Sequence, residues 1–138
     1  MSTSTTSRTI ADILLPPEAI PVMPPRTLVK EALERMSASK LGLACIVDAD
    51  GRLIGLFTDG DLRRLLLRSQ KPLSALFADD IIDHARREFT SVSPGTSIAD
   101  ALNLLQEREI FDLPVLGEDG RLEGLIHLHP ALRALLGE

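Results

Sequence analysis

The chain has 138 residues, of which 44% are hydrophobic and only 3% aromatic, and 15 basic against 20 acidic side chains give a net charge of −5. A chain of this length buries enough surface to fold without a metal or a disulfide. The negative charge disfavours nucleic acid and anionic membranes, and the absence of Trp and Tyr disfavours the stacking platforms that bind single-stranded nucleic acid. We therefore expect neither a nucleic-acid nor a membrane partner.

Residues 1–9 are rich in Ser and Thr, so we expect them to be disordered, and they lack the apolar core of a signal peptide. The longest apolar run, Leu41 to Val47, is too short to span a bilayer. The single cysteine, Cys45, excludes an intramolecular disulfide. These features fit a reduced, cytoplasmic setting, and the Met1 start favours a short native protein over a fragment.

The sequence repeats itself at an offset of 69 residues without a gap. A string of the form DGRLxGL recurs together with the helix that precedes it, which indicates two copies of one supersecondary unit. The coinciding residues are Pro25 and Pro94, Thr27 and Thr96, Ala32-Leu33 and Ala101-Leu102, Asp50-Gly51-Arg52-Leu53 and Asp119-Gly120-Arg121-Leu122, Gly55-Leu56 and Gly124-Leu125, and Arg64 and Arg133.

The first copy predicts a strand, a helix, two strands and a helix. A short apolar piece at 20–22 comes first, and then Thr27 is the predicted N-cap of a helix. Residues 43–47 form a buried strand, Asp50-Gly51 a tight turn and residues 52–57 a returning strand. The inward helical residues are Leu28, Ala32, Leu33 and Met36 in the first helix and Leu62, Leu65 and Leu66 in the second.

The second copy repeats this order. Ser97 is the predicted N-cap, Pro130 the first residue of the last helix, and the inward face carries Ile98, Ala101, Leu102 and Leu105. Neither copy can bury its sheet and helices alone. We therefore expect an α/β (α+β) fold of two βαββα units packed about a pseudo-twofold axis, with repeats at 10–69 and 81–138 and a linker at 70–80.

The segment from Gly55 to Asp61 runs from a buried strand into a helix N-terminus, where free N–H groups and the helix dipole attract a phosphate. Gly60 permits close approach to the backbone, and Thr58 offers a hydroxyl. Asp61 would repel a phosphate but can accept hydrogen bonds from two ribose hydroxyls. This pattern predicts a nucleotide site at Thr58, Asp59, Gly60 and Asp61; the alternative is plain helix capping by Asp59 or Asp61.

Arginines follow on the same predicted helix. Arg64 and Arg68 lie one turn apart and could form an anion-facing stripe, or a solvated helix face paired with aspartates. Arg86-Arg87 precede the first strand of the second copy, where they are solvated or reach an anion between the halves. We include Arg64 among the candidate ligand-binding residues.

The second copy places His127 and His129 where the first has Thr58 and Gly60. On a strand both imidazoles would point to the same side. They could bind a phosphate or a carboxylate, serve a structural role, or start a metal site if His84 or Asp112 supplied a third ligand. No paired ligand spacing supports a metal, so we predict none.

No catalytic constellation is present in the sequence. Cys45 lies in a predicted buried strand, no serine occupies a nucleophile elbow, and no phosphate-binding GKS or GKT loop occurs. We therefore predict a protein that is not an enzyme and requires no cofactor.

Two βαββα units with a string of the form GhxTxxD resemble a pair of cystathionine-β-synthase (CBS) domains, a Bateman module, from about Ile10 to Leu136. The segments 54–64 and 124–134 are similar to the C-terminal CBS pair of arabinose-5-phosphate isomerases of the sugar isomerase type. The catalytic domain of those isomerases is absent. Pro130 also departs from the family pattern, which often has Asp there.

This resemblance implies a module that binds an adenine or cytidine nucleotide, or a nucleotide sugar, in the clefts between its halves. It also implies regulation of a partner, such as a sugar-phosphate isomerase or another enzyme, and homodimerisation. By motif, Thr58 and Asp61 match the phosphate and ribose positions. The alternatives are a structural or dimerisation module with decayed ligand sites, a detached fragment of a sugar-phosphate isomerase, and an enzyme.

A homodimer is also predicted from the leucines themselves. Leu65, Leu66 and Leu67 are consecutive, so one of them must leave the inward stripe, and Leu132, Leu135 and Leu136 encircle their own helix. An exposed apolar patch of this kind is covered most simply by a second copy of the chain, and the alternative is a monomer that buries these leucines internally.

Overall fold

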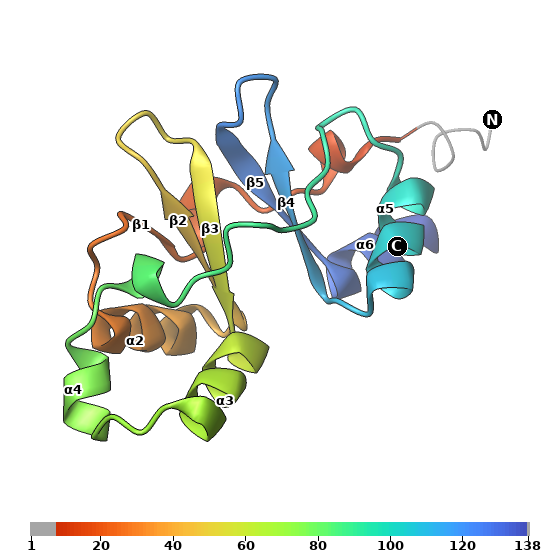
Figure 1. Cartoon of the computed structure of the whole chain (residues 1–138). Helices are drawn as coiled ribbons and strands as arrows, with labels where there is room; N and C mark the ends of the chain where they lie inside the picture. The colour runs from red at the N-terminus through yellow and green to blue at the C-terminus, as the bar shows by residue number, and fades with distance from the viewer. Residues whose placement is uncertain (1–7, 138) are drawn as a thin grey trace. The chain divides into compact units, whose positions relative to one another are not determined.

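The computed structural model describes residues 8–137, so the disorder expected of residues 1–9 lies outside the described residues for positions 1–7. The expectation is wrong for Thr9, which forms an isolated β-bridge with Ser97. The chain divides into two compact units. One contains the chain up to Pro17 and from Thr90 onward, and the other contains Glu18–Phe89. Figure 1 labels their helices and strands. Three short 3₁₀ turns, η1 (Ile10–Asp12), η2 (Pro17–Ala19) and η3 (Ile81–Asp83), lie in the connecting segments.

The unit Glu18–Phe89 is built on a three-stranded sheet of order β1-β2-β3. β1 (Val22–Met23) runs parallel to β2 (Leu43–Val47), and β3 (Leu53–Thr58) runs antiparallel to β2, with Leu43 opposite Thr58. The helices are α2 (Val29–Ser39), α3 (Asp59–Arg68) and α4 (Leu73–Phe77). Because α3 begins directly where β3 ends, the strand–helix junction at Thr58 is held in place by the sheet.

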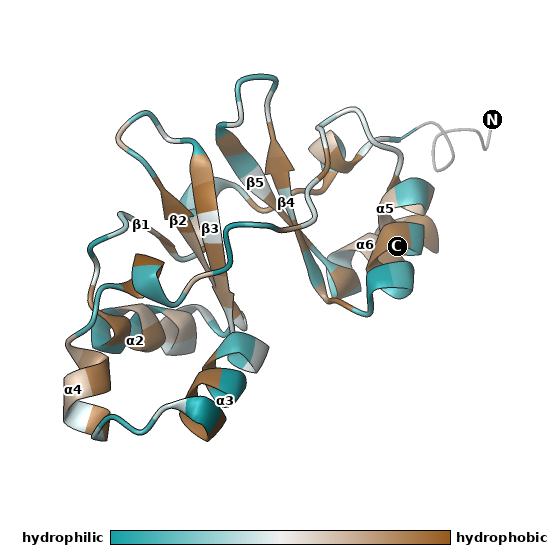
Figure 2. Cartoon of the chain, viewed as in Figure 1, coloured by the Kyte–Doolittle hydropathy of each residue, from teal (hydrophilic) through white to brown (hydrophobic). Residues whose placement is uncertain are grey.

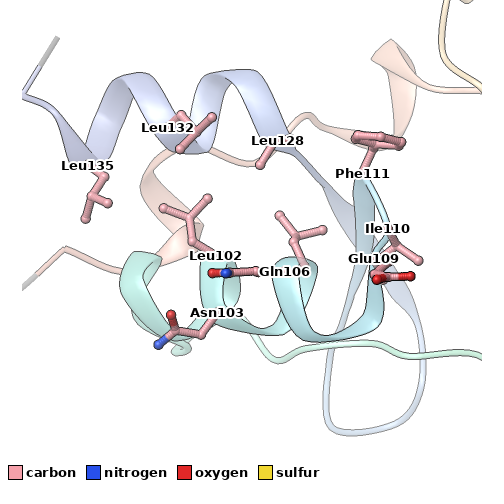
Figure 3. A pocket seen from close by; sticks show the side chains of 10 residues that line it. Leu102, Asn103, Gln106, Glu109, Ile110, Phe111, Leu128, Leu132 and Leu135 are labelled. Atoms are coloured by element: carbon pink, nitrogen blue, oxygen red, sulfur yellow. The ribbon is translucent and has the colours of Figure 1, made fainter.

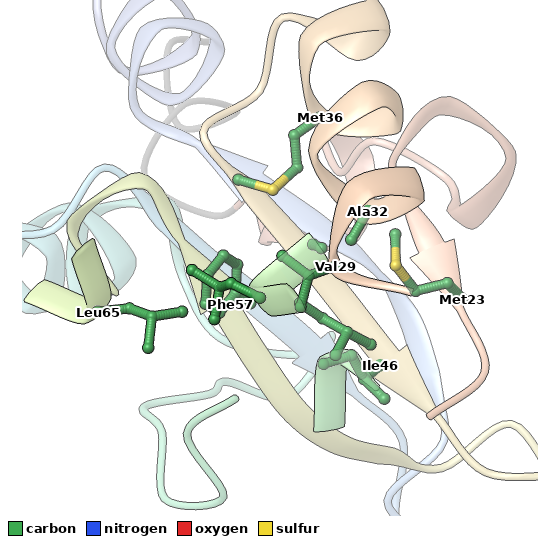
Figure 4. Packing of buried hydrophobic residues seen from close by; sticks show 10 residues of the cluster. Met23, Val29, Ala32, Met36, Ile46, Phe57 and Leu65 are labelled. Carbon is green, nitrogen blue, oxygen red and sulfur yellow. The ribbon is translucent and has the colours of Figure 1, made fainter. Parts of the chain in front are cut away.

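The core of this unit lies between its sheet and its helices (Figure 4). Hydrophobic residues are concentrated on β2 and β3 (Figure 2), as expected of a buried strand pair. Phe57 of β3 is fully buried against side chains of α2 and α3. The labelled members of this core are Met23, Val29, Ala32, Met36, Ile46, Phe57 and Leu65.

The other unit repeats this design with β4 (Asp112–Leu116) antiparallel to β5 (Leu122–His127), and with helices α5 (Ile98–Arg108) and α6 (Leu128–Leu135). The offset of 69 residues relates α2 to α5, β2 to β4 and β3 to β5 at both ends of each element. Even the left-handed residues that end α2 and α5, Lys40 and Glu109, coincide under it. The expected α+β tandem repeat is confirmed.

Each sheet gains an edge from the segment that precedes the other repeat. Leu15 exchanges both backbone hydrogen bonds with Leu125 of β5, at 2.8 and 2.9 Å, and Arg86 does the same with Leu56 of β3, at 2.8 and 3.0 Å. Ile10 is fully buried among residues of α5, β4 and β5. The compact units therefore differ from the sequence boundaries 10–69 and 81–138. Residues 8–17 pack with the second repeat, and residues 81–89 pack with the first.

The segment 70–80, expected to be a linker, contains α4. Leu76 of this helix is 1% exposed and belongs to the core cluster that includes α2. Lys71 also pairs with Asp79 at 2.8 Å. The segment is therefore part of the packed unit as well as a connection.

Four local predictions are wrong: Thr27 as an N-cap, Leu28 and Leu66 as inward residues, and Pro130 as the first residue of its helix. The N-cap of α2 is Leu28, which is 46% exposed, because the Thr27 hydroxyl donates to Pro24 O at 2.8 Å instead of capping the helix. Leu66 is exposed, while Leu65 is buried and Leu62 half-buried. Pro130 is the third residue of α6 rather than the first, a position where the missing N–H has no partner within the helix either. The Ser97 cap of α5 is confirmed, with Asp100 N donating to Ser97 Oγ at 3.0 Å.

Candidate functional site

The junction between β3 and α3 is organised by a reciprocal cap. Thr58 is both the last residue of β3 and the N-cap of α3. Its hydroxyl accepts a hydrogen bond from Asp61 N at 3.1 Å, and its backbone N–H donates to Asp61 Oδ2 at 2.9 Å. The Thr58 hydroxyl also lies 2.9 Å from the same carboxylate oxygen, to which it donates. The capping that sequence reasoning offered as the alternative role of Asp61 is therefore present.

Asp61 is buried, with 7% of its surface exposed, yet it is charged. Arg64 Nη2 lies 2.7 Å from Oδ1, and Arg86 Nε lies 3.0 Å from Oδ1 and 3.1 Å from Oδ2. Burial by itself raises the pKa of Asp61, but the hydrogen bonds from Arg64 and Thr58 and the charge of Arg86 outweigh it. The pKa of Asp61 therefore lies below its ordinary value, and the carboxylate is ionised at neutral pH.

Both arginines remain about half exposed at their side chains, 55% for Arg64 and 48% for Arg86. Two guanidinium groups on one carboxylate leave a local charge of +1, and each has further N–H groups available. This cluster therefore attracts an anion, and a planar guanidinium suits a phosphate or a carboxylate in particular.

Gly60 lies beneath this cluster. A Cβ at Gly60 would lie 3.4 Å from both terminal nitrogens of Arg64, so the missing side chain lets the guanidinium approach the first turn of α3. Asp59 is exposed, and its N–H donates to Gly42 O at 2.9 Å. The structure thus brings Thr58, Gly60, Asp61 and Arg64 together and leaves the Asp59 carboxylate outside the cluster.

Arg86 is the residue of this cluster that sequence reasoning left out of the candidate site. Its position follows from the backbone pairing of Arg86 with Leu56, which places it beside the strand that ends at Thr58. The only signal in the sequence was the pair Arg86-Arg87 itself, and nothing local distinguishes it from solvated arginines. Arg64 is paired with an aspartate, as the alternative to an anion-facing stripe with Arg68 expected. Asp61 also pairs with Arg86 across 25 residues of sequence.

The equivalent junction in the other unit has different chemistry. His127 is the N-cap of α6, but its Nδ1 atom contacts Asp112 Oδ1 at 2.7 Å instead of capping the helix. Asp112 and His127 are directly opposite each other on β4 and β5, as Leu43 and Thr58 are on β2 and β3. Burial raises the pKa of Asp112, and the contact with His127 only partly opposes this.

The prediction that His127 and His129 lie on one strand is wrong, because β5 ends at His127 and α6 begins at Leu128. Their rings nevertheless lie 5.7 Å apart in an edge-on arrangement. Of the two side chains named as a possible third metal ligand, Asp112 contacts His127, whereas His84 pairs with Asp79 at 2.8 Å. Residues 8–137 contain no group of three His, Cys, Asp or Glu side chains that could hold a metal ion.

Cys45 is fully buried in β2, as predicted for a core residue. No helix within residues 8–137 has the length and hydrophobicity needed to cross a membrane.

Comparison with known proteins gives the family. The CBS domain model matches residues 10–68 and 78–137. Arabinose 5-phosphate isomerase KdsD of Yersinia pestis is 37% identical over 125 residues, which cover 91% of this chain but only 37% of the isomerase. The chain therefore spans little more than a third of the curated relatives it matches.

Two solved structures show the same fold over nearly the whole chain. CBSX2 of Arabidopsis thaliana in complex with AMP has a TM-score of 0.81 and 30% identity, covering 94% of this chain and 96% of the other. A CBS domain-containing protein of unknown function from Bacillus anthracis has a TM-score of 0.85 at 16% identity, covering 100% and 99%. Its two family matches and its two repeated units show that the chain belongs to the CBS family, as a tandem CBS pair.

Proposed function

We propose that this CBS pair is a regulatory module without catalysis of its own, and that it binds a nucleotide or nucleotide sugar at the β3–α3 junction. The observation that carries this proposal is the buried, ionised Asp61 with two half-exposed arginines beside the N-terminus of α3. The AMP complex of CBSX2, which is 30% identical, supports the ligand class.

The contacts at the junction suggest how the roles are divided. Arg64 and Arg86 present free N–H groups and take the phosphate, assisted by the dipole of α3. Asp61 already accepts hydrogen bonds from Thr58, Arg64 and Arg86. It can accept ribose hydroxyls only if an arginine moves from the carboxylate to the phosphate, so phosphate and ribose binding are coupled.

The ligand is an adenine or cytidine nucleotide in this proposal, and the module requires no cofactor or metal. The ligand state is read by a partner, for which a sugar-phosphate isomerase is the first candidate because KdsD isomerases are similar to this chain over 91% of its length. We further propose a homodimer, based on Leu67 and Leu136, which are among the most exposed hydrophobic residues described, and a cytoplasmic location.

Isothermal titration calorimetry with AMP, CMP, a CMP-linked sugar and unphosphorylated adenosine tests the proposal. We expect one of the three phosphorylated ligands to bind and adenosine to bind at least about tenfold more weakly, the loss expected from charged hydrogen bonds. Arg64→Ala and Arg86→Ala should each weaken binding, whereas Arg63→Ala, an exposed arginine of the same helix, should not.

If the folded wild-type chain binds none of these ligands, the nucleotide proposal is wrong. The junction then serves as a helix cap in a structural or dimerisation module whose ligand site has decayed. Binding that is equally affected by Arg63→Ala would indicate a nonspecific charge effect and would also contradict the assigned site.

A further inference from the structure

The donors around the Asp61 carboxylate are divided unequally between its two oxygens. Thr58 donates to Oδ2 from its backbone N–H and from its hydroxyl, both at 2.9 Å. Arg64 Nη2 contacts Oδ1 at 2.7 Å. Arg86 Nε lies 3.0 Å from Oδ1 and 3.1 Å from Oδ2. Of the described residues, Arg86 alone therefore donates to both oxygens.

This division decides which arginine obstructs a ribose. Each oxygen of an ionised carboxylate accepts about two hydrogen bonds, and a vicinal diol needs a free position on both oxygens. Loss of Arg64 would clear Oδ1 alone, whereas loss of Arg86 clears Oδ1 and leaves only Thr58 on Oδ2. The Thr58 hydroxyl turns about a single bond and can donate to a phosphate instead, which clears the second position.

The guanidinium of Arg86 can leave Asp61 without any movement of its main chain. Arg86 exchanges both backbone hydrogen bonds with Leu56 of β3, at 2.8 and 3.0 Å. A Cβ at Gly55 would lie 3.2 Å from Ala85 Cβ and 3.4 Å from Arg86 O, so this segment packs closely on the strand. The Arg86 side chain is nevertheless 48% exposed. The main chain is therefore fixed, while the long side chain keeps the rotamer freedom to move.

The other unit lacks both partners of this contact. Leu15 pairs with β5 through its backbone as Arg86 pairs with β3, but its side chain carries no charge. Pro130 stands at the position equivalent to Asp61. The aspartate and the arginine that covers it therefore occur together, in the unit that carries the proposed nucleotide site.

We propose that Arg86 is a gate on this site: its guanidinium covers the acceptor positions of Asp61 that a ribose diol takes, and the phosphate of the ligand draws it away. A nucleoside has no anion to hold the displaced guanidinium, and inorganic phosphate has no diol for Asp61. The gate therefore selects ligands that carry both groups. This inference rests on the proposed nucleotide function and assigns the selection of phosphorylated ligands to one residue.

Calorimetry of the full chain tests the gate with AMP, CMP and a CMP-linked sugar, each compared with its nucleoside, adenosine or cytidine. Arg86→Ala should weaken binding of the nucleotide ligand but strengthen binding of its nucleoside about tenfold, because the ribose no longer displaces a charged hydrogen bond. Arg87→Ala makes the same charge change at the next residue, which is also exposed, and should alter neither affinity.

The movement of the guanidinium is measured separately by the NMR signal of the Arg86 Nε–H group, which is assigned by its loss in Arg86→Ala. The nucleotide ligand that binds should shift this signal, and inorganic phosphate should shift it in the same direction. Chloride at equal ionic strength should not, because the planar guanidinium pairs preferentially with phosphate.

Nucleoside binding elsewhere on the chain needs its own control. The apolar pocket between α5 and α6 has a volume of about 510 Å³, and its lining residues, none of which is basic, include Leu102, Leu132 and Phe111 (Figure 3). Binding there would respond to Phe111→Ser. The gain in nucleoside affinity should instead persist when Phe111→Ser is added to Arg86→Ala.

A folded Arg86→Ala chain that binds the nucleoside no more tightly than wild type would overturn the gate, as would an Nε–H signal that the bound nucleotide leaves in place. Either result leaves the nucleotide site itself intact. Wild type that binds none of the three phosphorylated ligands would overturn both proposals. If Arg86→Ala does not fold, Arg86→Gln removes the charge while keeping most of the side chain, and the same gain in nucleoside affinity is expected of it.

Discussion

Arg86 Nε lies 3.0 Å from Oδ1 of Asp61, and this pair connects the N-terminus of α3 to the segment that borders β3. Arg64, one turn along α3, holds the same oxygen at 2.7 Å. The carboxylate is therefore part of the helix cap and the anchor of two arginines at once. A change at Asp61 should alter both the stability of the unit and its affinity for anions.

Replacing Asp61 with alanine should lower the free energy of unfolding by about 1–3 kcal/mol, because it removes half of the capping box and the acceptor for Thr58 N–H. Asp59→Ala, which removes an exposed carboxylate from the same turn, should cost less than about 1 kcal/mol. Urea unfolding followed by circular dichroism measures both. Equal effects of the two changes would show that the buried contacts add nothing to stability.

The contribution of Asp61 should depend on pH with a defined sign. Its pKa is lowered in the folded chain from an ordinary value near 3.8, so its contribution is present above that value and is lost as the pH falls through the lower folded pKa. The difference in unfolding free energy between wild type and Asp61→Asn should therefore be constant from pH 5 to 7 and shrink below about pH 4. A difference that grows on acidification would contradict the lowered pKa.

Asp112 should show the opposite behaviour. Burial raises the pKa of Asp112, so its ionised form lowers the free energy of unfolding at neutral pH. As the pH falls through the raised folded pKa, Asp112 is protonated and this loss of stability is relieved. Because the contact with His127 opposes the shift, His127→Ala should raise the pKa of Asp112 further. The chemical shift of the Asp112 carboxyl carbon, followed in an NMR titration, measures this pKa directly. His129→Ala, which leaves the 2.7 Å contact in place, should leave the titration of Asp112 unchanged.

The helix within the segment expected to be a linker should be required for stability. Leu76→Ala should lower the free energy of unfolding by about 2–4 kcal/mol, the usual cost of truncating a buried leucine. Leu73→Ala, on the same helix but 54% exposed, should cost less than about 0.5 kcal/mol. If both substitutions had equally small effects, residues 70–80 would be a simple connection after all.

The two junctions should differ in nucleotide binding. The unit with Thr58, Asp61, Arg64 and Arg86 carries the anion cluster, whereas the other has Pro130 in place of Asp61 and His127 paired with Asp112. We therefore expect about one nucleotide bound per chain in calorimetry. Two equal sites per chain would contradict this asymmetry.

The repeat and most elements were predictable from the sequence because their signals are local or recur. Strands β2 and β3 follow from continuous apolar runs flanking an Asp-Gly turn, and the offset of 69 residues predicts their counterparts in β4 and β5. The candidate residues Thr58, Gly60 and Asp61 share one short segment, so their proximity needed no tertiary information.

The helix ends were less predictable. Thr27 has the side chain of an N-cap, but its hydroxyl donates to Pro24 O. Val29 N–H, in the first turn of α2, donates at 2.9 Å to Asp79 O, which lies between α4 and η3. A carbonyl fifty residues away thus replaced the local cap, and no residue pattern near Thr27 indicates it.

The sequence by itself determined the tandem repeat, the strand–helix junction at Thr58 and the buried character of Cys45, because periodicity and turn chemistry act over a few residues. Only the tertiary structure decided that Arg86 reaches Asp61, that Asp112 contacts His127, and that Leu15 and Arg86 complete the sheet of the more distant repeat. Backbone groups at a sheet edge accept any segment with extended geometry. The choice of segment therefore depends on burial of residues such as Ile10, which packs against elements that begin almost ninety residues later.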